Sequence, residues 1–326
     1  MSGKVFHAPF VHLNDGFNLV AVTERSKKQV AQDYPGVKSY DTIDELIADE
    51  SIDLIIINTP NYTHYDYAKT CLLAGKHILV EKPFTATVAQ AKELFELART
   101  VGKKALVYHN RRFDSGFKIT KEIINSGKLG KLTEVHFRYD RYRNEIGPKV
   151  FKEEPTFEAS GLQYDLGPHL LDQAIALFGK PEKFNKTLAS YRENSKVDDY
   201  FFIHLIYPNQ LNVYLTSTML AADIPPAFVV NGMLGSFAKN HGDTQEGQLL
   251  KGMKPADKGY GIEQPEDAGK LTLVTQDGGR EIVTLESPQG NYGDLFEAVY
   301  QTIANNQPYP ITEEDIITQL EILESN

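Results

Sequence analysis

The stretch Ala74-Gly-Lys-His-Ile-Leu-Val-Glu-Lys-Pro-Phe84 decides how the rest of the sequence is interpreted. Gly75 is a helix stop, and the short apolar run that follows it is typical of a buried strand in a parallel sheet. Charged residues at the carboxyl end of such a strand lie at the crevice where open α/β sheets bind ligands. Pro83 ends the strand and restricts Lys82 to extended geometry, so we expect Lys82 to be held rigidly at the edge of that crevice. For so short a motif, a surface loop with a solvated ion pair is the alternative.

Composition restricts the classes of protein to consider. The chain has 326 residues, which is long for one hydrophobic core and suggests two domains. Its net charge of −10 argues against a surface for nucleic acid or anionic membranes, and no apolar run approaches the roughly 20 residues of a membrane span. The single cysteine, Cys71, excludes an intramolecular disulfide and favours a reducing compartment. We therefore expect a cytoplasmic protein that binds neither nucleic acid nor membranes.

The first third of the chain alternates strand and helix patterns. We expect strands at 17–22, 54–57, 78–80 and 105–108, with helical patterns between them. This alternation predicts βαβ units and a parallel sheet, so residues 1–112 are interpreted as a dinucleotide-binding domain.

After residue 112 the pattern changes to short alternating strands, which predicts a mostly antiparallel second sheet. Residues 113–326 are thus expected to form an α+β domain, with a long loop from 241 to 269. The expected strands are 131–142, 183–191, 200–207, 211–217, 271–275 and 281–285, and the expected helices are 115–124, 294–304 and 313–323.

The front of the chain departs from the pattern of a doubly wound nucleotide-binding domain. Such a domain opens with a strand and a glycine-rich turn, and neither precedes the first predicted helix. Ser2 suits the N-cap of that helix, and Gly3 suits the last glycine of the turn, so the helix would hold the pyrophosphate. We favour an absent first strand, because the strand at 17–22 arrives at the spacing of a second strand. A simple leading helix over 1–16 is the alternative.

Three motifs occur in a characteristic order: Thr59-Pro-Asn-x-x-His64, Val80-Glu-Lys-Pro83 and Gly161-x-x-x-Asp165-x-Gly-x-His169-x-x-Asp172. Together they resemble the Gfo/Idh/MocA family of nicotinamide-dependent oxidoreductases, and the similarity covers nearly the whole chain. The first nine residues also resemble the first helix of a subgroup that contains an NADP-dependent scyllo-inositol dehydrogenase. The resemblance implies a Rossmann-type domain followed by a substrate-binding and oligomerisation domain.

The resemblance implies catalytic roles for three residues. Lys82 would lie near the nicotinamide and the reacting hydroxyl, where a cation stabilises the negative charge that develops on oxygen. His169 would be the general base, since the unperturbed pKa of histidine is near neutrality. Asp165 would bind a substrate hydroxyl or orient the site. For His169 alone, a structural role is the alternative, and we leave Asp172 as a helix cap or salt-bridge partner.

The helix that carries Asp165 and His169 contains Pro168, which fits best in a first turn. We therefore expect this helix to begin near Tyr164 or Asp165. A continuous helix places Asp165 and His169 on one face. No third ligand with matching spacing accompanies them, and hydride transfer needs no metal, so we expect none.

The type of cofactor depends on Thr23-Glu-Arg-Ser-Lys27, after the second predicted strand. An acid such as Glu24 holds a ribose 2′-hydroxyl, whereas an arginine such as Arg25 accommodates a 2′-phosphate. We favour NADP over NAD, and a solvated charge run is the alternative. The other expected cofactor contacts are Ser2, Gly3, Asn58, Thr59, Pro60, Asn61, His64, Glu81, Lys82 and Asn110.

We therefore expect an oxidoreductase that transfers a hydride between NAD(P) and a secondary alcohol of a polyol, inositol or sugar. Tyr139, Arg141 and Tyr142 could line the substrate pocket, while Arg111 and Arg112 could contact the substrate or pack the domain seam. A homo-oligomer, dimer or tetramer, is expected from the resemblance. The alternatives are a catalytically silent cofactor- or sugar-binding regulatory protein and an enzyme of this fold that acts on a non-sugar carbonyl.

Overall fold

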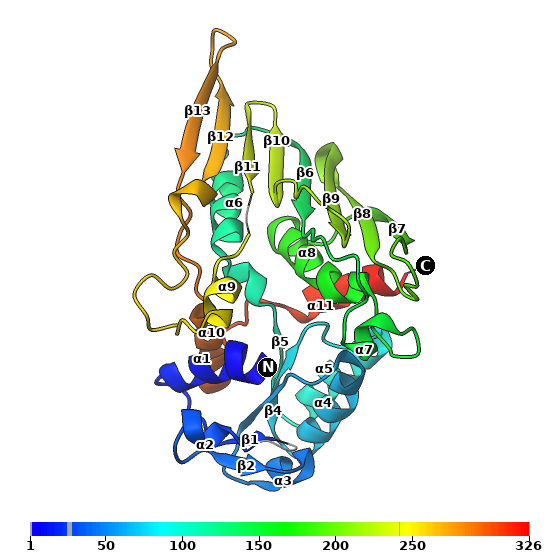
Figure 1. Cartoon of the computed structure of the whole chain (residues 1–326), viewed down its shortest axis with the longest axis vertical. Coiled ribbons are helices and arrows are strands. Elements are labelled where there is room, and N and C mark those ends of the chain that lie inside the picture. The colour runs from blue at the N-terminus through cyan, green and yellow to red at the C-terminus, as the bar shows by residue number, and fades with distance from the viewer. Residues whose placement is uncertain (1, 25–27, 241, 326) are drawn as a thin grey trace.

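A computed structural model describes residues 2–24, 28–240 and 242–325. Figure 1 shows short parallel strands at one end of the molecule and a large sheet at the other. Within the described residues, the large sheet has eight strands, and the N-terminal half holds one sheet of three strands and one of two. The predicted fold class, a Rossmann-type parallel half followed by a mostly antiparallel α+β half, is therefore confirmed.

The N-terminal half follows the expected alternation of strands and helices. Its elements are η1 (Gly3–His7), α1 (Ala8–Leu13), β1 (Ala21–Thr23), α2 (Val30–Asp33), β2 (Lys38–Tyr40), α3 (Ile43–Ala48), β3 (Leu54–Ile57), η2 (Asn61–Thr63), α4 (His64–Leu73), β4 (His77–Glu81), α5 (Val88–Thr100), β5 (Ala105–Tyr108) and η3 (Asn110–Phe113). Strand β4 pairs in parallel with β3 on one side and β5 on the other.

Strand β4 is buried on both faces, which explains its continuous apolar run. Ile78 and Val80 join the main core, whereas Leu79 joins a second cluster with Phe10 of α1. All three strand residues are fully buried. Because successive side chains of a strand point to opposite faces, a strand covered on both sides needs apolar residues at every position. The predicted buried strand at 78–80 is thus confirmed.

The two N-terminal sheets are separate. Strand β1 pairs with β2, and in the described residues no ladder joins β1 to β3, so each keeps one unpaired edge. The strand expected at 17–22 is shorter and later, at Ala21–Thr23. Lys38–Tyr40 was not predicted as a strand, because three residues give too little alternation. The expectation of an absent first strand stays a prediction.

The first helix differs from the prediction at its start. Ser2 stands at the N-cap position of η1, as predicted, but it has helical φ and ψ and its side chain makes no cap hydrogen bond. The Ser2 hydroxyl donates instead to Glu81 Oε1 at 3.1 Å. The first turn, η1, is a π-helix. A tertiary partner at the end of β4 thus replaces the local cap that the sequence suggested.

The C-terminal half is built around the large sheet, with strand order β13-β12-β11-β10-β6-β9-β8-β7. Its elements are α6 (Ser115–Asn125), β6 (Leu132–Arg138), α7 (Val150–Glu153), α8 (Leu162–Phe178), β7 (Lys183–Ala189), β8 (Tyr200–Tyr207), η4 (Pro208–Gln210), β9 (Leu211–Thr218), β10 (Phe228–Gly232), β11 (Gly235–Lys239), α9 (Gln245–Leu250), η5 (Pro265–Asp267), β12 (Gly269–Val274), β13 (Arg280–Leu285), α10 (Gly293–Ala304) and α11 (Glu313–Glu324). Its neighbouring strands are antiparallel except β6 and β9.

Helices cover one face of this sheet (Figure 1), and α8 contacts β8, β9 and α11. Strand β8 alternates buried and half-buried residues along its whole length, as a sheet with one covered face requires. The hairpin β10–β11 and helix α9 were not predicted. Phe228–Gly232 and Gly235–Lys239 are short and joined through glycine, and α9 lies within the loop expected over 241–269.

Helix α8 begins at Leu162, earlier than the predicted start near Tyr164 or Asp165, and it contains Pro168 in its interior. A proline there removes the donor for the carbonyl of residue 164 and disturbs the ladder of helical hydrogen bonds. The next carbonyl, that of Asp165, accepts a hydrogen bond from Lys82 Nζ. The contact with the N-terminal half lies on the turn that Pro168 disturbs.

Candidate functional site

Polar residues follow three neighbouring strands at the same edge of the parallel sheet. Asn58 follows β3, Glu81 and Lys82 stand at the end of β4, and Asn110 follows β5. Strands β3, β4 and β5 are adjacent and parallel, so their carboxyl ends meet at one edge. In open α/β sheets this edge is where ligands bind. Asn110 is buried, whereas Asn58 is partly accessible.

Lys82 joins the two halves of the chain. The bond between Lys82 and Pro83 is cis. The ammonium group of Lys82 donates to the Asp165 backbone carbonyl at 2.5 Å and lies 3.3 Å from Asp165 Oδ1. Burial lowers the pKa of Lys82, and the neighbouring charge of Lys152 lowers it further, while Asp165 opposes the shift. The ammonium group is thus fixed in place, and 15% of the side-chain surface of Lys82 remains accessible.

Asp165 is the centre of a small ion cluster. Its Oδ1 contacts Lys82 and also Lys152, which lies on α7. Burial alone would raise the pKa of Asp165, but the charges of Lys82 and Lys152 outweigh burial and hold that pKa below its usual value. Asp165 is therefore an ionised carboxylate that orients Lys82. Sequence reasoning missed Lys152, because nothing in its local sequence links it to a helix that starts ten residues later.

His169 lies one helical turn after Asp165 on α8 and is 6% exposed. In the part of the chain that the structure describes, its Nδ1 is buried without a hydrogen-bond partner. Burial and the nearby charges of Lys82, Arg111 and Arg141 lower the pKa of His169 well below its usual value. The imidazole is therefore neutral at neutral pH, which is the form that can accept a proton.

Asp172 is a salt-bridge partner, one of the two roles left open for it. Arg112 grips its carboxylate with two nitrogens, each at 2.8 Å, and Gln319 adds a hydrogen bond at 3.2 Å. Arg112 also contacts Asp315 of α11 at 3.1 Å. Of the two roles considered for Arg112, the structure places it in the seam between η3, α8 and α11.

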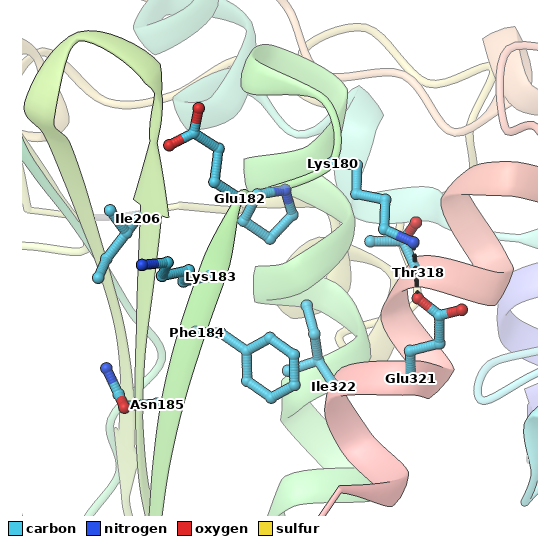
Figure 2. A pocket seen from close by; sticks show the side chains of 10 residues that line it. Lys180, Glu182, Lys183, Phe184, Asn185, Ile206, Thr318, Glu321 and Ile322 are labelled. Atoms are coloured by element: carbon cyan, nitrogen blue, oxygen red, sulfur yellow. Dashed lines mark hydrogen bonds and ion pairs between the residues drawn. The ribbon is translucent and has the colours of Figure 1, made fainter.

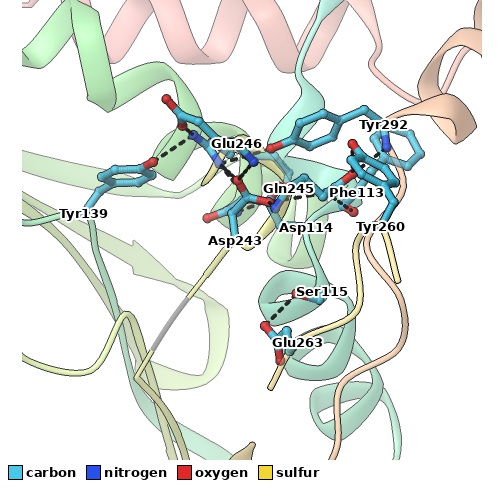
Figure 3. Close-up of polar contacts among 12 residues, drawn as sticks. Phe113, Asp114, Ser115, Tyr139, Asp243, Gln245, Glu246, Tyr260, Glu263 and Tyr292 are labelled. Carbon is cyan, nitrogen blue, oxygen red and sulfur yellow. Dashed lines mark hydrogen bonds and ion pairs between the residues drawn. The ribbon is translucent and has the colours of Figure 1, made fainter. Parts of the chain in front are cut away.

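Arg111 is also buried in the seam. Its polar partners gather around it, and Figure 3 shows Tyr139, Asp243 and Glu246 among them. Burial raises the pKa of Asp114 well above its usual value, and the neighbouring carboxylate of Asp243 raises it further. Burial also raises the pKa of the Tyr139 hydroxyl, although Arg111 opposes this shift. The partners of the Arg111 guanidinium are Asp114, Asp243, Glu246, Tyr139 and Tyr292.

The structure brings the predicted contacts of the first helix to the end of β4. His7 contacts Glu81 Oε1 at 2.9 Å, the same oxygen that accepts from Ser2. Burial raises the pKa of Glu81, but the contact with His7 outweighs it and leaves that pKa below its usual value. A Cβ added to Gly3 would lie 2.9 Å from Asn58 Nδ2, so the backbone there runs close to β3. His7 was missed, because only the fold brings it to Glu81.

The turn after β3 is held mainly by contacts within the protein. His64 is fully buried; its two ring nitrogens lie 2.8 Å from Pro83 O and 3.0 Å from Thr59 O. Burial lowers the pKa of His64. Asn61 donates to Ala159 O at 3.0 Å, while Pro60 precedes η2 in extended geometry. The roles predicted for these residues in cofactor binding stay predictions, and His64 and Asn61 already have structural partners.

Glu24 accepts hydrogen bonds from the backbone at the start of α2. Its carboxylate accepts from Ser39 Oγ at 2.7 Å and from the backbone N–H groups of Gln29 and Val30. Burial alone would raise the pKa of Glu24, but these hydrogen bonds together keep that pKa below its usual value. Arg25, the predicted contact for a 2′-phosphate, lies outside the described residues.

Other features of the described chain lie away from this edge. A hollow of about 450 Å³ lined by the segment 180–182, β7, β8 and α11 (Figure 2) contains none of the predicted site residues. Within 2–24, 28–240 and 242–325, no three metal-ligating side chains gather and no helix is long and apolar enough to cross a membrane. The expectation of no metal stays a prediction.

Comparison with family profiles gives two matches that together cover most of the chain. Residues 1–109 match an oxidoreductase family described by its NAD-binding Rossmann fold. Residues 117–238 match the C-terminal domain of the same GFO/IDH/MocA family. The predicted boundary between residues 112 and 113 falls between the two matches and stays a prediction.

Individual relatives match over the full length of the chain. An uncharacterised oxidoreductase of Schizosaccharomyces pombe is 37% identical, over 100% of this chain and 93% of the relative. A scyllo-inositol 2-dehydrogenase (NADP⁺) of Bacillus subtilis is 33% identical, over 100% of this chain and 90% of the relative. The crystal structure of an oxidoreductase from Bacillus cereus is 35% identical with a TM-score of 0.91, over 99% of this chain and 92% of that chain.

Proposed function

The chain belongs to the Gfo/Idh/MocA family of NAD(P)-binding oxidoreductases, and we propose that it transfers a hydride between NAD(P) and a secondary alcohol of a polyol, inositol or sugar. The observation that carries the proposal is the pairing of Lys82 with Asp165 across the two domains. This pairing holds the ammonium group of Lys82 at the end of β4, where its positive charge helps to lower the pKa of His169. The relative from Bacillus subtilis, named for scyllo-inositol, supports a cyclic polyol as one substrate class.

Each of the three residues has a role that suits alcohol oxidation. Bound NAD(P)⁺ would supply the hydride acceptor. The ammonium of Lys82 stabilises negative charge on the substrate oxygen as the C–H bond breaks. His169 accepts the hydroxyl proton, because its lowered pKa keeps it unprotonated at neutral pH. Asp165 holds Lys82 in position and keeps it charged. In the reverse direction the same residues return the proton and polarise the carbonyl.

NADP is the proposed cofactor, and the residues present suit a dinucleotide. Gly3 and Asn58 lie side by side at the edge where a ligand would bind, since a Cβ added to Gly3 would lie 2.9 Å from Asn58 Nδ2. The Glu24 carboxylate already accepts hydrogen bonds from Ser39, Gln29 and Val30. These contacts fix Glu24 within the N-terminal half, and the preference for a 2′-phosphate rests on Arg25, the arginine that follows it in the sequence. Residues that would hold the cofactor are Ser2, Gly3, Asn58, Thr59, Pro60, Asn61, Glu81 and Asn110.

We also propose that the chain forms a homo-oligomer through the open face of the large sheet. On β6, β8 and β9, the rings of His136, Tyr214, His204 and Phe202 stack at 4.6–5.7 Å between centroids. These residues are only half-buried, in contrast to the covered face. A row of aromatic side chains on a sheet face suits burial against a second copy. Size-exclusion chromatography with light scattering tests this proposal, and a cytoplasmic location stays a prediction.

The first test of function is fluorescence titration of the chain with NADPH and NADH, followed by a screen of polyols and sugars. We expect tighter binding of NADPH, and oxidation of at least one secondary alcohol with NADP⁺. Binding without any turnover would favour the alternative, a catalytically silent regulatory protein. If Lys82→Ala and His169→Ala proteins kept full turnover of an identified substrate, the assignment of roles would be wrong.

A further inference from the structure

We propose that the substrate carries an anionic group besides the reacting hydroxyl, and that Arg141 and Lys152 recognise this group. The inference rests on the proposed function and names the substrate class more narrowly, as a sugar or polyol bearing a carboxylate or a phosphate. It starts from an imbalance of charge around Asp165.

Arg141 is a half-buried cation that has no carboxylate partner among the described residues. Its guanidinium carbon lies 5.2 Å from the centre of the Tyr139 ring, and none of the described residues places a carboxylate within ion-pair distance of it. Arg111, 5.3 Å from the same ring, contacts three carboxylates. Two other arginines of this domain, Arg138 and Arg192, also have carboxylate partners. These three arginines therefore already have anionic partners, whereas Arg141 remains able to bind an anion.

The position of Arg141 relates it to the catalytic residues. It follows β6, and its backbone N–H donates to the carbonyl of Thr218, the last residue of β9. Its guanidinium stacks on the Tyr139 ring, and the Tyr139 hydroxyl accepts a hydrogen bond from Arg111 at 2.8 Å. The Arg111 carbonyl in turn accepts from Gln173, one helical turn after His169 on α8. In keeping with this position, the charge of Arg141 lowers the pKa of both Asp165 and His169. Lys152 reaches the same region from α7, where it contacts Asp165 Oδ1. Two elements of the substrate domain thus bring cations to the residues that would handle the alcohol.

Cations outnumber carboxylates among the direct contacts of this site. Asp165 is contacted by two ammonium groups, those of Lys82 and Lys152, whereas among the described residues Arg141 contacts no carboxylate. His169 adds no negative charge. The excess is notable in a chain with a net charge of −10. An unpaired cation at a partly buried site is costly unless a partner binds it, and a neutral polyol supplies no countercharge.

A carboxylate or phosphate suits these groups. The guanidinium fork matches either anion with two parallel hydrogen bonds, and a nearby ammonium adds a point charge. A charge-assisted hydrogen bond contributes enough to change affinity by about 10- to 100-fold. The anion would hold one end of the substrate at Arg141 and leave a hydroxyl for Lys82 and His169. A neutral polyol would lack this anchor.

The test compares kcat/KM for matched substrates with NADP⁺: a sugar acid such as gluconate, a sugar phosphate and a neutral polyol such as myo-inositol. We expect the wild-type chain to prefer one of the anionic substrates by about tenfold or more, and the preferred one identifies the anion. Arg141→Gln should abolish the preference through KM. The control Arg99→Gln, at an exposed arginine paired with Glu313, should keep it. Equal use of neutral and anionic substrates, or a preference that survives Arg141→Gln, would overturn the inference while the proposed function stands.

A binding measurement decides the inference even without turnover. Calorimetric titration of the NADPH-saturated chain with gluconate, the sugar phosphate and myo-inositol measures the affinity for each ligand independently of hydride transfer. Binding of an anionic ligand that Arg141→Gln weakens about tenfold or more, and Arg99→Gln leaves unchanged, supports the inference. Equal binding of all three ligands, or of none, refutes it. Failure of the proposed function is distinct from this result, because it is a lack of hydride transfer whatever binds.

Discussion

The salt bridge between Arg112 and Asp172 offers a sharp test of how the seam supports the site. We consider the substitution Arg112→Met, which keeps an apolar stem of similar length and removes the charge. Asp172 is 1% exposed and would lose both 2.8 Å contacts with Arg112. Its remaining neighbours would be Gln319 at 3.2 Å and His109 at 3.9 Å. A buried carboxylate would then have one neutral donor and a histidine whose pKa burial lowers.

The expected magnitude follows from the loss of one partner in a buried pair. Breaking such a pair costs about 3–5 kcal/mol, because the remaining charge is buried without compensation. The lost contact with the more exposed Asp315 adds up to about 1 kcal/mol. The shift is roughly 2–4 °C per kcal/mol for chains of 150–250 residues and smaller for longer ones, so about 2 °C per kcal/mol applies to this chain of 326 residues. We therefore expect a melting temperature lower by about 6–12 °C.

The assay is thermal unfolding of a double-mutant cycle made from Arg112→Met, Asp172→Asn and the double variant. Because the double variant removes both charges, we expect it to be more stable than Arg112→Met alone by about 1 kcal/mol or more. Arg99→Met is the matched control at an exposed pair and should cost about 1 kcal/mol or less. The reasoning is refuted if Arg112→Met costs no more than the control, or if Asp172→Asn does not relieve it.

Three further predictions concern single groups. Lys82→Met should lower kcat by about 10²–10³-fold, because it removes the cation proposed to stabilise the developing oxyanion. The control Lys69→Met, at an exposed ion pair, should leave kcat unchanged, and steady-state kinetics measure both. His169 should give the wild-type kcat/KM an acid limb below the ordinary histidine range, because burial lowers its pKa, and His169→Asn should remove that limb from the pH profile. Burial raises the pKa of Asp198 from 3.8 to about 6, so its protonated form is favoured on folding and this stabilising contribution is lost as pH rises through about 6. Because of Asp198, the free energy of unfolding of the wild-type chain should fall by up to about 3 kcal/mol between pH 4 and pH 7. Urea unfolding at these two pH values should show that Asp198→Asn removes this fall.

The parts of the fold that the sequence predicted well are those with strong local signals. Strand β4 has an apolar run bounded by Gly75 and Pro83, and the structure buries that run on both faces. Strand β8 alternates regularly and forms as expected. Where the signal is short, prediction failed, as for β2 and for the hairpin β10–β11. In α8, Pro168 suggested a later start, but tertiary contacts on the disturbed turn allow the helix to include it.

The candidate site shows a different limit. The motif residues Lys82, Asp165 and His169 were predicted by resemblance, and the structure places Lys82 against Asp165. Lys152 and His7 were missed although each contacts a predicted residue. Their contacts join segments 13 and 74 positions apart, and the spacing of residues carries no information about how two segments meet. Predicting them requires the way the two halves dock.

That docking is concentrated on one face of helix α8. Asp165, His169 and Asp172 lie at helical spacings of four and three, so their side chains follow one stripe, and Gln173 beside them donates to Arg111 O. Lys82 grips the start of the stripe and Arg112 grips its end. His169, the proposed proton acceptor, is therefore held between two ion pairs that cross the seam. Because neither Arg112 nor Asp172 is assigned to substrate contact, weakening their pair should lower kcat by misplacing His169 while leaving the binding of NADPH intact.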